Sequence, residues 1–322
     1  MKSLLKVAVV VIVASLARTG IAATFPDHQI KIINPYAAGG TDGFFAQLVA
    51  KSLGTQFGQD VIVEPHPGAG GNIGSTIVAR AEPDGYTLLA GTSGSNAVNP
   101  SLYKNMPYDA RHDMRLVATL ATTDNVIVVG ASSPYKTLRD VIEYAKGHPG
   151  KVTYGSSGVG SVLHLSGAML DHMAGTQMVH VAYKGTAPAL IDVIGGRVTM
   201  MFANAPSVVN LIKDGKLRAL AVSGAHRAAA LPDVPTVQEA GVAGFDLVSW
   251  FGIMAPYKTP PDVVAKLNAA IVRMLKEPEI RERFASQGAT PLIKDADQSE
   301  KFFVDQLKIW ADVVNVSGAK IE

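Results

Sequence analysis

The chain has 322 residues, of which 48% are hydrophobic and 17% are charged, and its formal net charge is +2. This length predicts two domains, and near-neutrality argues against a nucleic-acid-binding protein, because binding phosphates requires a marked basic excess. The absence of cysteine excludes disulfides, cysteine-ligated zinc, a thiol nucleophile and a lipid anchor on cysteine.

Residues 1–23 have the pattern of a secretory signal peptide. Lys2 and Lys6 precede an apolar run from Val7 to Ala17, which is too short to cross a bilayer. Small residues follow up to Ala23, after which we expect cleavage. The pattern therefore predicts an exported, soluble protein. An uncleaved membrane anchor is the less favoured interpretation, because the apolar run is short.

Short apolar strands, glycine-rich loops and helices alternate in the first half of the chain. The first unit has a predicted strand at 30–34, a loop up to Gly40, and a helix that Thr41 or Asp42 is expected to cap. The aromatic residues Phe44 and Phe45 lie on this helix, where we expect them to pack in the core. Two more strands are predicted at 61–64 and 86–90, followed by loops at 67–71 and 91–96.

The same order recurs in the second half. Predicted strands at 152–154, 179–183 and 198–202 each lead into a loop, and helices are expected to follow, one of them from Pro188 to Ile194. Runs of βα units build parallel sheets with helices on both faces. Each half is therefore predicted to form one α/β lobe.

Two extended apolar segments, 116–129 and 245–254, fit neither half alone and are predicted to cross between the lobes. Two crossings imply that the helical tail, 260–322, returns to pack on the first lobe. The predicted division is lobe 1 at 24–122 plus 248–322, and lobe 2 at 123–247.

The glycine-rich loops are predicted to form an anion site between the lobes. In open parallel sheets, ligands bind beyond the carboxyl ends of the strands, where these loops lie. A helix N-terminus offers free N–H groups and partial positive charge, and glycine allows close approach. Gly39 to Thr41 on one lobe would face Ser157 to Ser161 on the other, which suits a molecule with a carboxylate at each end. The alternative is that the glycines serve only the turns.

Motifs typical of enzymes are absent on inspection. The run from Gly68 to Gly74 resembles a dinucleotide loop, but its last glycine comes one residue late. Neither GxxxxGK[ST] nor GxSxG occurs. His164, His172 and His180 are eight residues apart, which does not match a zinc site, and His164 alone lies near a cleft loop. We expect no enzymatic activity, no metal and no cofactor.

Several motifs together carry a family resemblance over essentially the whole mature chain. The chain resembles the Bug-type periplasmic solute-binding receptors of tripartite tricarboxylate transporters. The motifs are Pro35 to Gly40, Pro67 to Gly74, Pro83 to Tyr86, Gly91 to Asn96, Asn99 to Tyr103, Val181 to Ala189, Gly215 to Leu220, Leu231 to Thr236 and Ser249 to Gly252. The resemblance implies a type II periplasmic-binding-protein fold that closes on its ligand.

The resemblance also implies the ligand-binding residues. Carboxylate groups would be held by the first glycine loop and by the N-terminus of a helix in lobe 2, and further residues would line the cleft. The candidate residues are Ala38, Gly39, Gly40, Thr41, Asp42, Thr92, Ser93, Asn96, Ser157, Gly158, Ser161, His164, Ala203, Asn204, Trp250 and Phe251.

Two departures from the family pattern bear on the ligand. Asp42 comes one residue early, with Gly43 where aspartate is usual, and Ala203 stands where many relatives have an acid. A lost carboxylate would disfavour an ammonium group, since a buried cation needs a partner. The sequence therefore favours a di- or aromatic carboxylate without an amino group.

The sequence is compatible with three functions. The favoured hypothesis is a monomeric periplasmic receptor that captures a small carboxylate and presents it to membrane transporter subunits. The alternative is a ligand-sensing co-receptor for a sensor kinase. A periplasmic serine-dependent enzyme is less favoured, since it requires a serine–base pair and His164 is the only nearby base. No nucleic acid is expected as a partner.

Overall fold

The computed structural model describes residues 25–317, and the predicted signal peptide lies outside them. The described strands form one curled sheet of ten strands in the order β2-β1-β3-β9-β4-β7-β5-β6, with β8 and β10 both paired to β4. None of the helices within residues 25–317 has the length and apolar character needed to cross a membrane.

The first part of the sheet is parallel, as the βα pattern predicts. Strand β1 (Ile30–Asn34) pairs in parallel with β2 (Val61–Pro65) and with β3 (Thr87–Thr92). The helical elements of this part are α1 (Thr41–Phe57), the 3₁₀ turn η1 (Ala69–Gly71), α2 (Asn72–Ala79), the π-helical turn η2 (Gly94–Val98) and α3 (Asn99–Leu102).

The second part repeats this arrangement. Strand β5 (Thr153–Ser156) pairs in parallel with β6 (Val179–Ala182) and β7 (Met200–Asn204), while β8 (Leu217–Val222) pairs with β4. Its helices are α4 (Leu138–Gly147), α5 (Val162–Ala174), α6 (Thr186–Ile194) and α7 (Ala205–Lys213).

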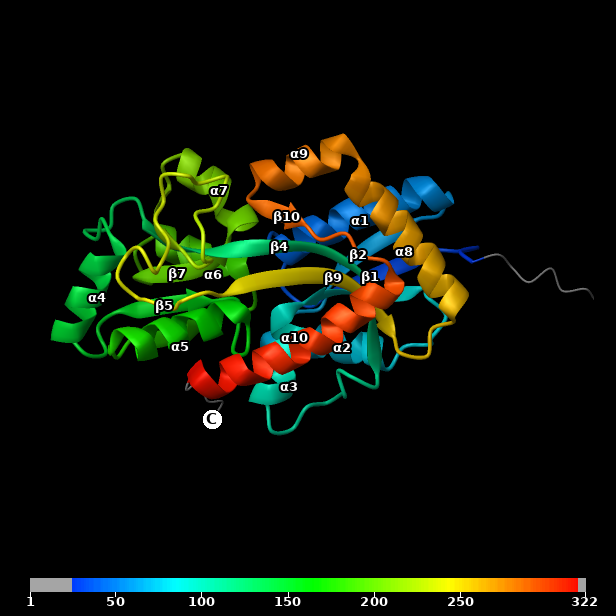
Figure 1. Cartoon of the computed structure of the whole chain (residues 1–322), viewed down its shortest axis with the longest axis horizontal. Coiled ribbons are helices and arrows are strands. Elements are labelled where there is room, and N and C mark those ends of the chain that lie inside the picture. Colours follow the sequence, from blue (N-terminus) through cyan, green and yellow to red (C-terminus); the bar gives the residue numbers. More distant parts are fainter. Residues whose placement is uncertain (1–24, 318–322) are drawn as a thin grey trace, which may run out of the picture.

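Two long antiparallel strands join the two parts and run side by side across the molecule (Figure 1). Strand β4 (Met114–Gly130) pairs with β9 (Val248–Pro256) up to Asp124, and from Asn125 onward it pairs with β7 and β8. The prediction of two crossing segments is confirmed, although the second strand begins at Val248 and not at 245. We name the two parts lobe 1 (25–122 with 248–317) and lobe 2 (123–247); these boundaries are our proposal.

The C-terminal helices return to lobe 1. They are α8 (Pro261–Lys276), α9 (Pro278–Ser286) and α10 (Ala296–Ser317), with β10 (Ala289–Pro291) pairing to β4. Helix α8 contacts α1 and β4, whereas α10 contacts β4 and also α5 of lobe 2. Figure 1 shows α10 running along lobe 1 and ending at the edge of lobe 2, near α5. Trp250 of β9 packs edge-on against Phe302 of α10, with 5.8 Å between ring centroids.

Aromatic residues fill the core of lobe 1 beneath α1. Phe45 is 2% exposed, and its ring lies 5.0 Å from both Phe251 and Phe284. The prediction that Phe45 packs in the core is confirmed, and the partly buried Phe44 packs against the same cluster. A helix that buries this face is held firmly on the sheet, so its N-terminus is fixed in position.

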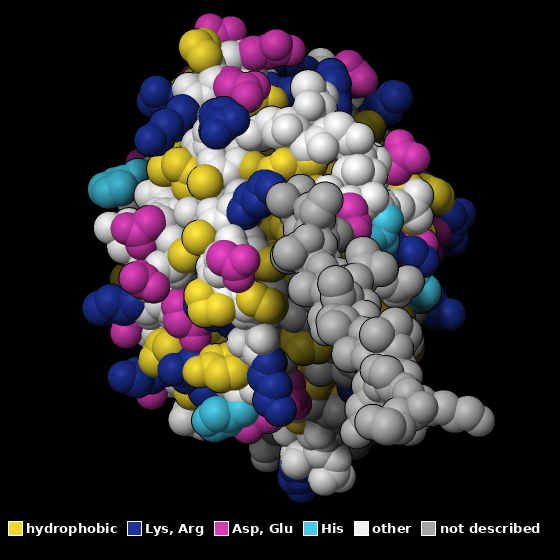
Figure 2. All heavy atoms as spheres, turned by 90° about the vertical axis from the view of Figure 1, so that its right-hand side faces the viewer, with side chains coloured by type: hydrophobic (Ala, Val, Ile, Leu, Met, Phe, Trp, Pro, Cys, Tyr) yellow, Lys and Arg dark blue, Asp and Glu magenta, His cyan; other side chains and the backbone are white. Residues whose placement is uncertain are grey.

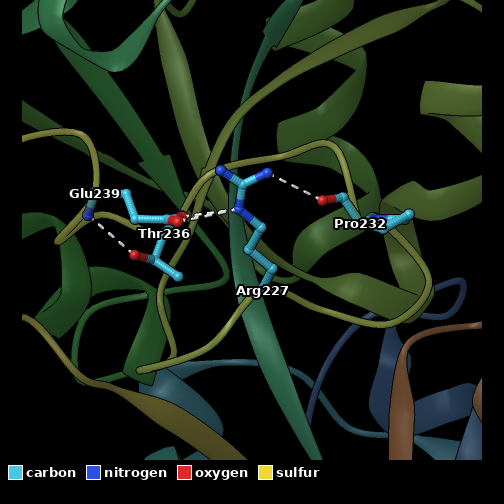
Figure 3. Close-up of polar contacts among 4 residues, drawn as sticks. All are labelled: Arg227, Pro232, Thr236 and Glu239. Atoms are coloured by element: carbon cyan, nitrogen blue, oxygen red, sulfur yellow. Dashed lines mark hydrogen bonds and ion pairs between the residues drawn. The ribbon is translucent and has the colours of Figure 1, made fainter.

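The segment between β8 and β9 contains no regular strand or helix, and side-chain contacts order it (Figure 3). The guanidinium group of Arg227 donates to both carboxylate oxygens of Glu239 at 3.2 and 2.9 Å, and to the carbonyl oxygen of Pro232 at 3.2 Å. Thr236 and Glu239 exchange backbone-to-side-chain hydrogen bonds of 2.7 and 3.0 Å. These contacts shape the return from lobe 2 into β9.

Figure 2 shows the end of the molecule formed by lobe 1, where basic and acidic side chains are mixed over the described surface. Mixed charge fits the formal net charge of +2. On this face, the described residues carry no broad basic area of the kind that nucleic-acid binding requires.

Two predicted helix starts are wrong. Gly40, not Thr41 or Asp42, is the N-cap of α1, and no side chain caps it. Thr41 instead directs its hydroxyl group across to Ser207 of lobe 2, at 2.8 Å. Helix α6 begins at Thr186 and not at Pro188; a proline in the first turn is tolerated because its missing N–H has no intrahelical partner there.

Candidate functional site

Strand ends and helix starts from both lobes converge on a small cavity between them. Its walls combine hydroxyl, amide and carboxyl groups with the apolar side chains of Val162, Leu163 and Phe251. The lining residues are Tyr36, Asp42, Thr92, Ser93, Gly94, Ser157, Ser161, Val162, Leu163, Thr186, Asn204, Ser249 and Phe251. We call this space the inter-lobe cavity.

The inter-lobe cavity is small. Its volume is about 20 Å³, which is close to the space that one water molecule needs. Three hydrogen bonds hold the lobes together around it: Ala37 N–H to the Lys184 carbonyl oxygen at 2.9 Å, the Thr41–Ser207 hydroxyl pair at 2.8 Å, and Tyr103 O–H to the Val159 carbonyl oxygen at 3.0 Å. In this form the cavity is too small to hold a dicarboxylate.

A second, open cavity lies on the outer side of the first glycine loop, between α1 and α7. Its volume is about 720 Å³ and it contains two cationic side chains, Lys51 and Arg283. It also contains Ala38, Gly39, Gly40 and Thr41 from the predicted site. We call this space the outer groove, and it is the competing position for an anionic ligand.

Residues at the N-termini of helices from both lobes line the inter-lobe cavity. Ser161 caps α5 and its Oγ accepts a hydrogen bond of 3.1 Å from the backbone N–H of His164. Thr186 and Asp42 lie in the first turns of α6 and α1, and Asn204 precedes α7. The partial positive charge of these ends favours an anion.

The floor of the inter-lobe cavity joins the ligand-facing residues to the crossing strands. Asn204 Nδ2 donates to Asn125 Oδ1 at 2.7 Å and to Ser249 Oγ at 2.9 Å, and Ser249 Oγ donates to Asn125 Oδ1 at 2.9 Å. Asn125 lies on β4 and Ser249 on β9. A ligand that contacts Asn204 is thus one hydrogen bond away from both strands that link the lobes.

The structure brings seven of the sixteen predicted residues into the inter-lobe cavity and four into the outer groove. The seven are Asp42, Thr92, Ser93, Ser157, Ser161, Asn204 and Phe251, and the four are Ala38, Gly39, Gly40 and Thr41.

Five predicted residues line neither of these two cavities. Asn96 accepts a hydrogen bond from Thr92 N–H and supports the wall from behind. Gly158 packs against Gly70 of lobe 1. Ala203 and Trp250 lie in the hydrophobic core, because their positions on β7 and β9 face the helices packed against the sheet. His164 is the fifth.

His164 lies behind the loop and forms a stack with His180 of β6, with 4.0 Å between ring centroids. Its Nδ1 accepts a hydrogen bond of 3.3 Å from Gly160 N–H. Burial lowers the pKa of His164 to about 4 and that of His180 to about 3, where repulsion from His164 contributes further. Both rings are therefore neutral at physiological pH and stabilise the loop.

In the part of the chain that the structure describes, the serine hydroxyl that bonds to a histidine ring lies in the core. Ser156 Oγ and His180 Nε2 are 2.7 Å apart, but Ser156 is fully buried and its Oγ also bonds the backbone of Gly158. Within residues 25–317, no serine of the inter-lobe cavity bonds to a histidine ring, and no cluster of three metal-ligating side chains is present.

Asp42 and Tyr36 are the ionisable groups of the inter-lobe cavity. Asp42 is 7% exposed and burial raises its pKa to about 7, although the Asn34 side chain and the backbone N–H groups of Asp42 and Gly43 oppose this rise. Burial also raises the pKa of Tyr36, whose hydroxyl group donates to the Gly70 carbonyl oxygen at 3.1 Å. Asp42, one of the predicted residues, therefore brings one carboxyl group to the cavity from the helical position before Gly43.

Sequence reasoning missed six residues of the inter-lobe cavity: Tyr36, Gly94, Val162, Leu163, Thr186 and Ser249. Thr186 carried a usable signal, because it follows a strand and a glycine and starts a helix, as Thr41 does. Tyr36 and Ser249 lay within the motifs that carry the family resemblance. Val162 and Leu163 carried no signal, since apolar residues at a helix start usually pack in the core.

Two lobes joined by two crossing strands, with helix N-termini around a cavity between the lobes, define the class of periplasmic solute-binding proteins. Residues 45–318 match the family of tripartite tricarboxylate transporter family receptors, and the chain belongs to this family, whose members are periplasmic solute-binding receptors. Protein BugT of Bordetella pertussis is 36% identical over 313 residues, which are 95% of this chain and 96% of that protein.

Two solved structures of similar proteins contain a ligand. Rpa4515 of R. palustris, solved with adipate, is 34% identical with a TM-score of 0.89 over 92% of this chain and 100% of that chain. MatC of Rhodopseudomonas palustris, solved with bound malate, is 31% identical with a TM-score of 0.84 over 90% of this chain and 100% of that chain. These likenesses agree with the predicted type II periplasmic-binding-protein fold.

Proposed function

We propose that the chain captures a small carboxylate in the inter-lobe cavity, with a di- or aromatic carboxylate without an amino group favoured, and presents it to a membrane transporter. The observation that carries this proposal is the lining of the cavity: hydroxyl and amide groups and helix N-termini from both lobes, with no lysine, arginine or histidine among the lining residues. Such a lining binds anions through neutral donors.

Capture requires the lobes to open and close. Strands β4 and β9 are the connections around which such a hinge motion would occur, and the ligand stabilises the closed form by contacting both lobes. A transporter that recognises the surface of the closed form would then receive only the loaded receptor. In the same proposal, residues 1–23 direct export to the periplasm and the receptor acts as a monomer.

The ligand class is supported by the complexes of two similar proteins with adipate and malate. The preference against an amino group no longer rests on a missing carboxylate, because Asp42 lines the cavity. It rests instead on the raised pKa of Asp42, which favours the neutral carboxyl group over the charged form that an ammonium group would need.

A thermal-shift panel of mono-, di- and tricarboxylates, with amino-acid analogues alongside, tests the proposal. We expect a dicarboxylate such as adipate or malate to raise the melting temperature in a concentration-dependent way. The absence of a shift with every carboxylate would contradict the proposed ligand class.

Gly40→Val gives this panel a structural control. A Cβ atom at Gly40 would meet the Asp42 carboxyl oxygen at 2.7 Å, so the larger side chain displaces Asp42 and should remove the ligand-induced shift. Gly147→Val makes the same substitution where a Cβ atom has open space, and it should retain the shift. Retention in both variants would remove the first glycine loop from the site.

A further inference from the structure

One carboxyl group of the inter-lobe cavity, that of Asp42, has an oxygen atom without a hydrogen-bond partner. Asp42 is 7% exposed and lines the cavity, and its Oδ2 atom has no hydrogen-bond partner. The other oxygen, Oδ1, lies beside Gly40. Because a buried polar atom without a partner is costly, an unbonded carboxyl oxygen in a ligand cavity is expected to bond to the ligand.

The groups packed around Asp42 are neutral. Lobe 1 contributes Asn34 from β1, Tyr36 from the following loop, and Thr92 and Ser93 at the end of β3; lobe 2 contributes Ser157, Ser161, Thr186 and Asn204. Tyr36 is the only other ionisable group of the cavity, and the charge of Asp42 raises its pKa further, which keeps it protonated.

The two cationic side chains near the first glycine loop do not neutralise the charge of Asp42. Lys51 and Arg283 line the outer groove and not the inter-lobe cavity, and neither contributes to the pKa of Asp42. No described side chain therefore supplies the counter-charge that an ionised Asp42 would require in the closed form.

We propose, building on the proposed function, that Asp42 binds the ligand in its protonated form and donates its Oδ2–H group to a carboxylate oxygen of the ligand. Two carboxylates in contact in a dry cavity cannot both be ionised, so they share one proton, as paired carboxylates do. On binding, ionised Asp42 takes up one proton from solution. The neutral acid that results donates a hydrogen bond to the ligand carboxylate. The receptor thus captures a carboxylate and a proton together.

This arrangement assigns ligand specificity to Asp42. A carboxylate ligand accepts a hydrogen bond from protonated Asp42. A ligand that places an ammonium group at Oδ2 requires ionised Asp42, so the Asp42 proton is released to solution. The direction of proton transfer on binding therefore distinguishes the two ligand classes without any structure of the complex.

The test is calorimetric titration of the full-length mature protein with adipate and with malate at pH 6 and pH 8, in buffers of different ionisation enthalpy. Both probes are fully ionised at pH 8 and mostly ionised at pH 6, so the small proton exchange of the free probe at pH 6 is subtracted. We expect proton uptake approaching one per ligand at pH 8, little uptake at pH 6, and an affinity that falls up to tenfold per pH unit above pH 7.

The variant Asp42→Asn keeps a donor of the same shape that does not titrate. It should bind at pH 6 within a few-fold of the wild type, take up no proton at pH 8 and lose the dependence on pH. The control is Asp262→Asn, because Asp262 holds the same second position of a helix, α8, but is exposed; it should behave as the wild type.

The outcomes separate this inference from the proposed function. Binding of adipate or malate without proton uptake, or uptake that persists in Asp42→Asn, overturns the role of Asp42 and leaves the proposed function intact. Proton release on binding of an amino-bearing ligand, together with loss of that binding in Asp42→Asn, overturns it in favour of an ammonium partner. If no carboxylate binds at any pH, the proposed function fails and this inference fails with it. The wild-type measurement decides the matter even where the variant does not fold.

Discussion

The hydroxyl group of Tyr103 in lobe 1 donates a hydrogen bond of 3.0 Å to the carbonyl oxygen of Val159 in lobe 2. Beside it, Gly70 of lobe 1 lies so close to the same carbonyl group that a Cβ atom on Gly70 would overlap it. Contact between the lobes therefore depends on the side chain of Tyr103, which reaches across the cleft, and on the absence of a side chain at Gly70.

The substitution Gly70→Ala should prevent complete closure without unfolding either lobe, because the added methyl group occupies the position of the Val159 carbonyl oxygen. X-ray scattering should show no ligand-induced compaction, and affinity should fall at least tenfold. The backbone of Gly70 has a φ of +62°, which itself strains alanine. Gly58→Ala introduces the same strain at a φ of +67° in open space and should close normally. Normal compaction of Gly70→Ala would show that this contact does not limit closure.

Tyr103→Phe should weaken closure and leave the fold unchanged. The loss of one hydrogen bond between the lobes removes about 1 kcal/mol from the closed form, equivalent to about a fivefold loss of affinity. Calorimetric titration with the best ligand of the panel measures it. The exposed Tyr257 provides the matched variant Tyr257→Phe, which should bind as the wild type does; an equal loss in both variants would refute a specific role for Tyr103.

Protonation of the histidine stack should destabilise the fold at mildly acidic pH. The pKa of His164 is about 4 and that of His180 about 3 in the folded protein, against 6.5 for the free side chain. The unfolded chain then binds more protons below about pH 6.5, so stability is full above this pH and is lost as the pH falls toward 4. From pH 7 to pH 5 we expect a loss of about 2 kcal/mol per histidine.

His180→Gln should reduce this pH dependence, because glutamine retains polar atoms near Ser156 and does not titrate. Urea denaturation at pH 5 and pH 7 provides the measurement. The control is His172→Gln, since His172 is exposed on α5. An unchanged difference between the two pH values in His180→Gln would contradict the assignment of the effect to the stack.

Asp42 should have the opposite effect on stability. Its pKa is about 7 in the folded protein against 3.8 for the free side chain, so the folded state binds more protons and stability falls as the pH rises from about 4 to 7. Asp42→Asn should therefore stabilise the ligand-free protein at pH 8 by up to about 4 kcal/mol and change little at pH 4. Denaturation at the two pH values measures this; equal stability of variant and wild type at pH 8 would show that Asp42 is solvated there.

The fold was predictable from the sequence because its signals are local. Strands alternate with glycine loops and helices, and the two segments that broke this alternation are the crossing strands β4 and β9. The site was harder to predict. Thr41 and Asp42 are adjacent in sequence, yet one lines the outer groove and the other the inter-lobe cavity, and only the helical rotation between them separates the two.

Neighbouring residues on one strand can likewise face different parts of the structure. Ala203 and Asn204 are neighbours on β7, but successive side chains point to opposite faces of a strand. Ala203 therefore enters the core while Asn204 lines the cavity. The pairing of Asn204 with Asn125 and Ser249 joins three distant segments, and no local pattern in the sequence indicates such a contact.

The most direct test of the central claim is a crystal structure of the mature protein with adipate or with the best ligand of the panel. In this complex we expect the lobes to enclose the ligand in an enlarged inter-lobe cavity, with its carboxylates at the helix N-termini near Ser161 and Thr186 and one carboxylate oxygen bonded to Asp42 Oδ2. Ligand bound in the outer groove, between Lys51 and Arg283, with the inter-lobe cavity still closed, would contradict it.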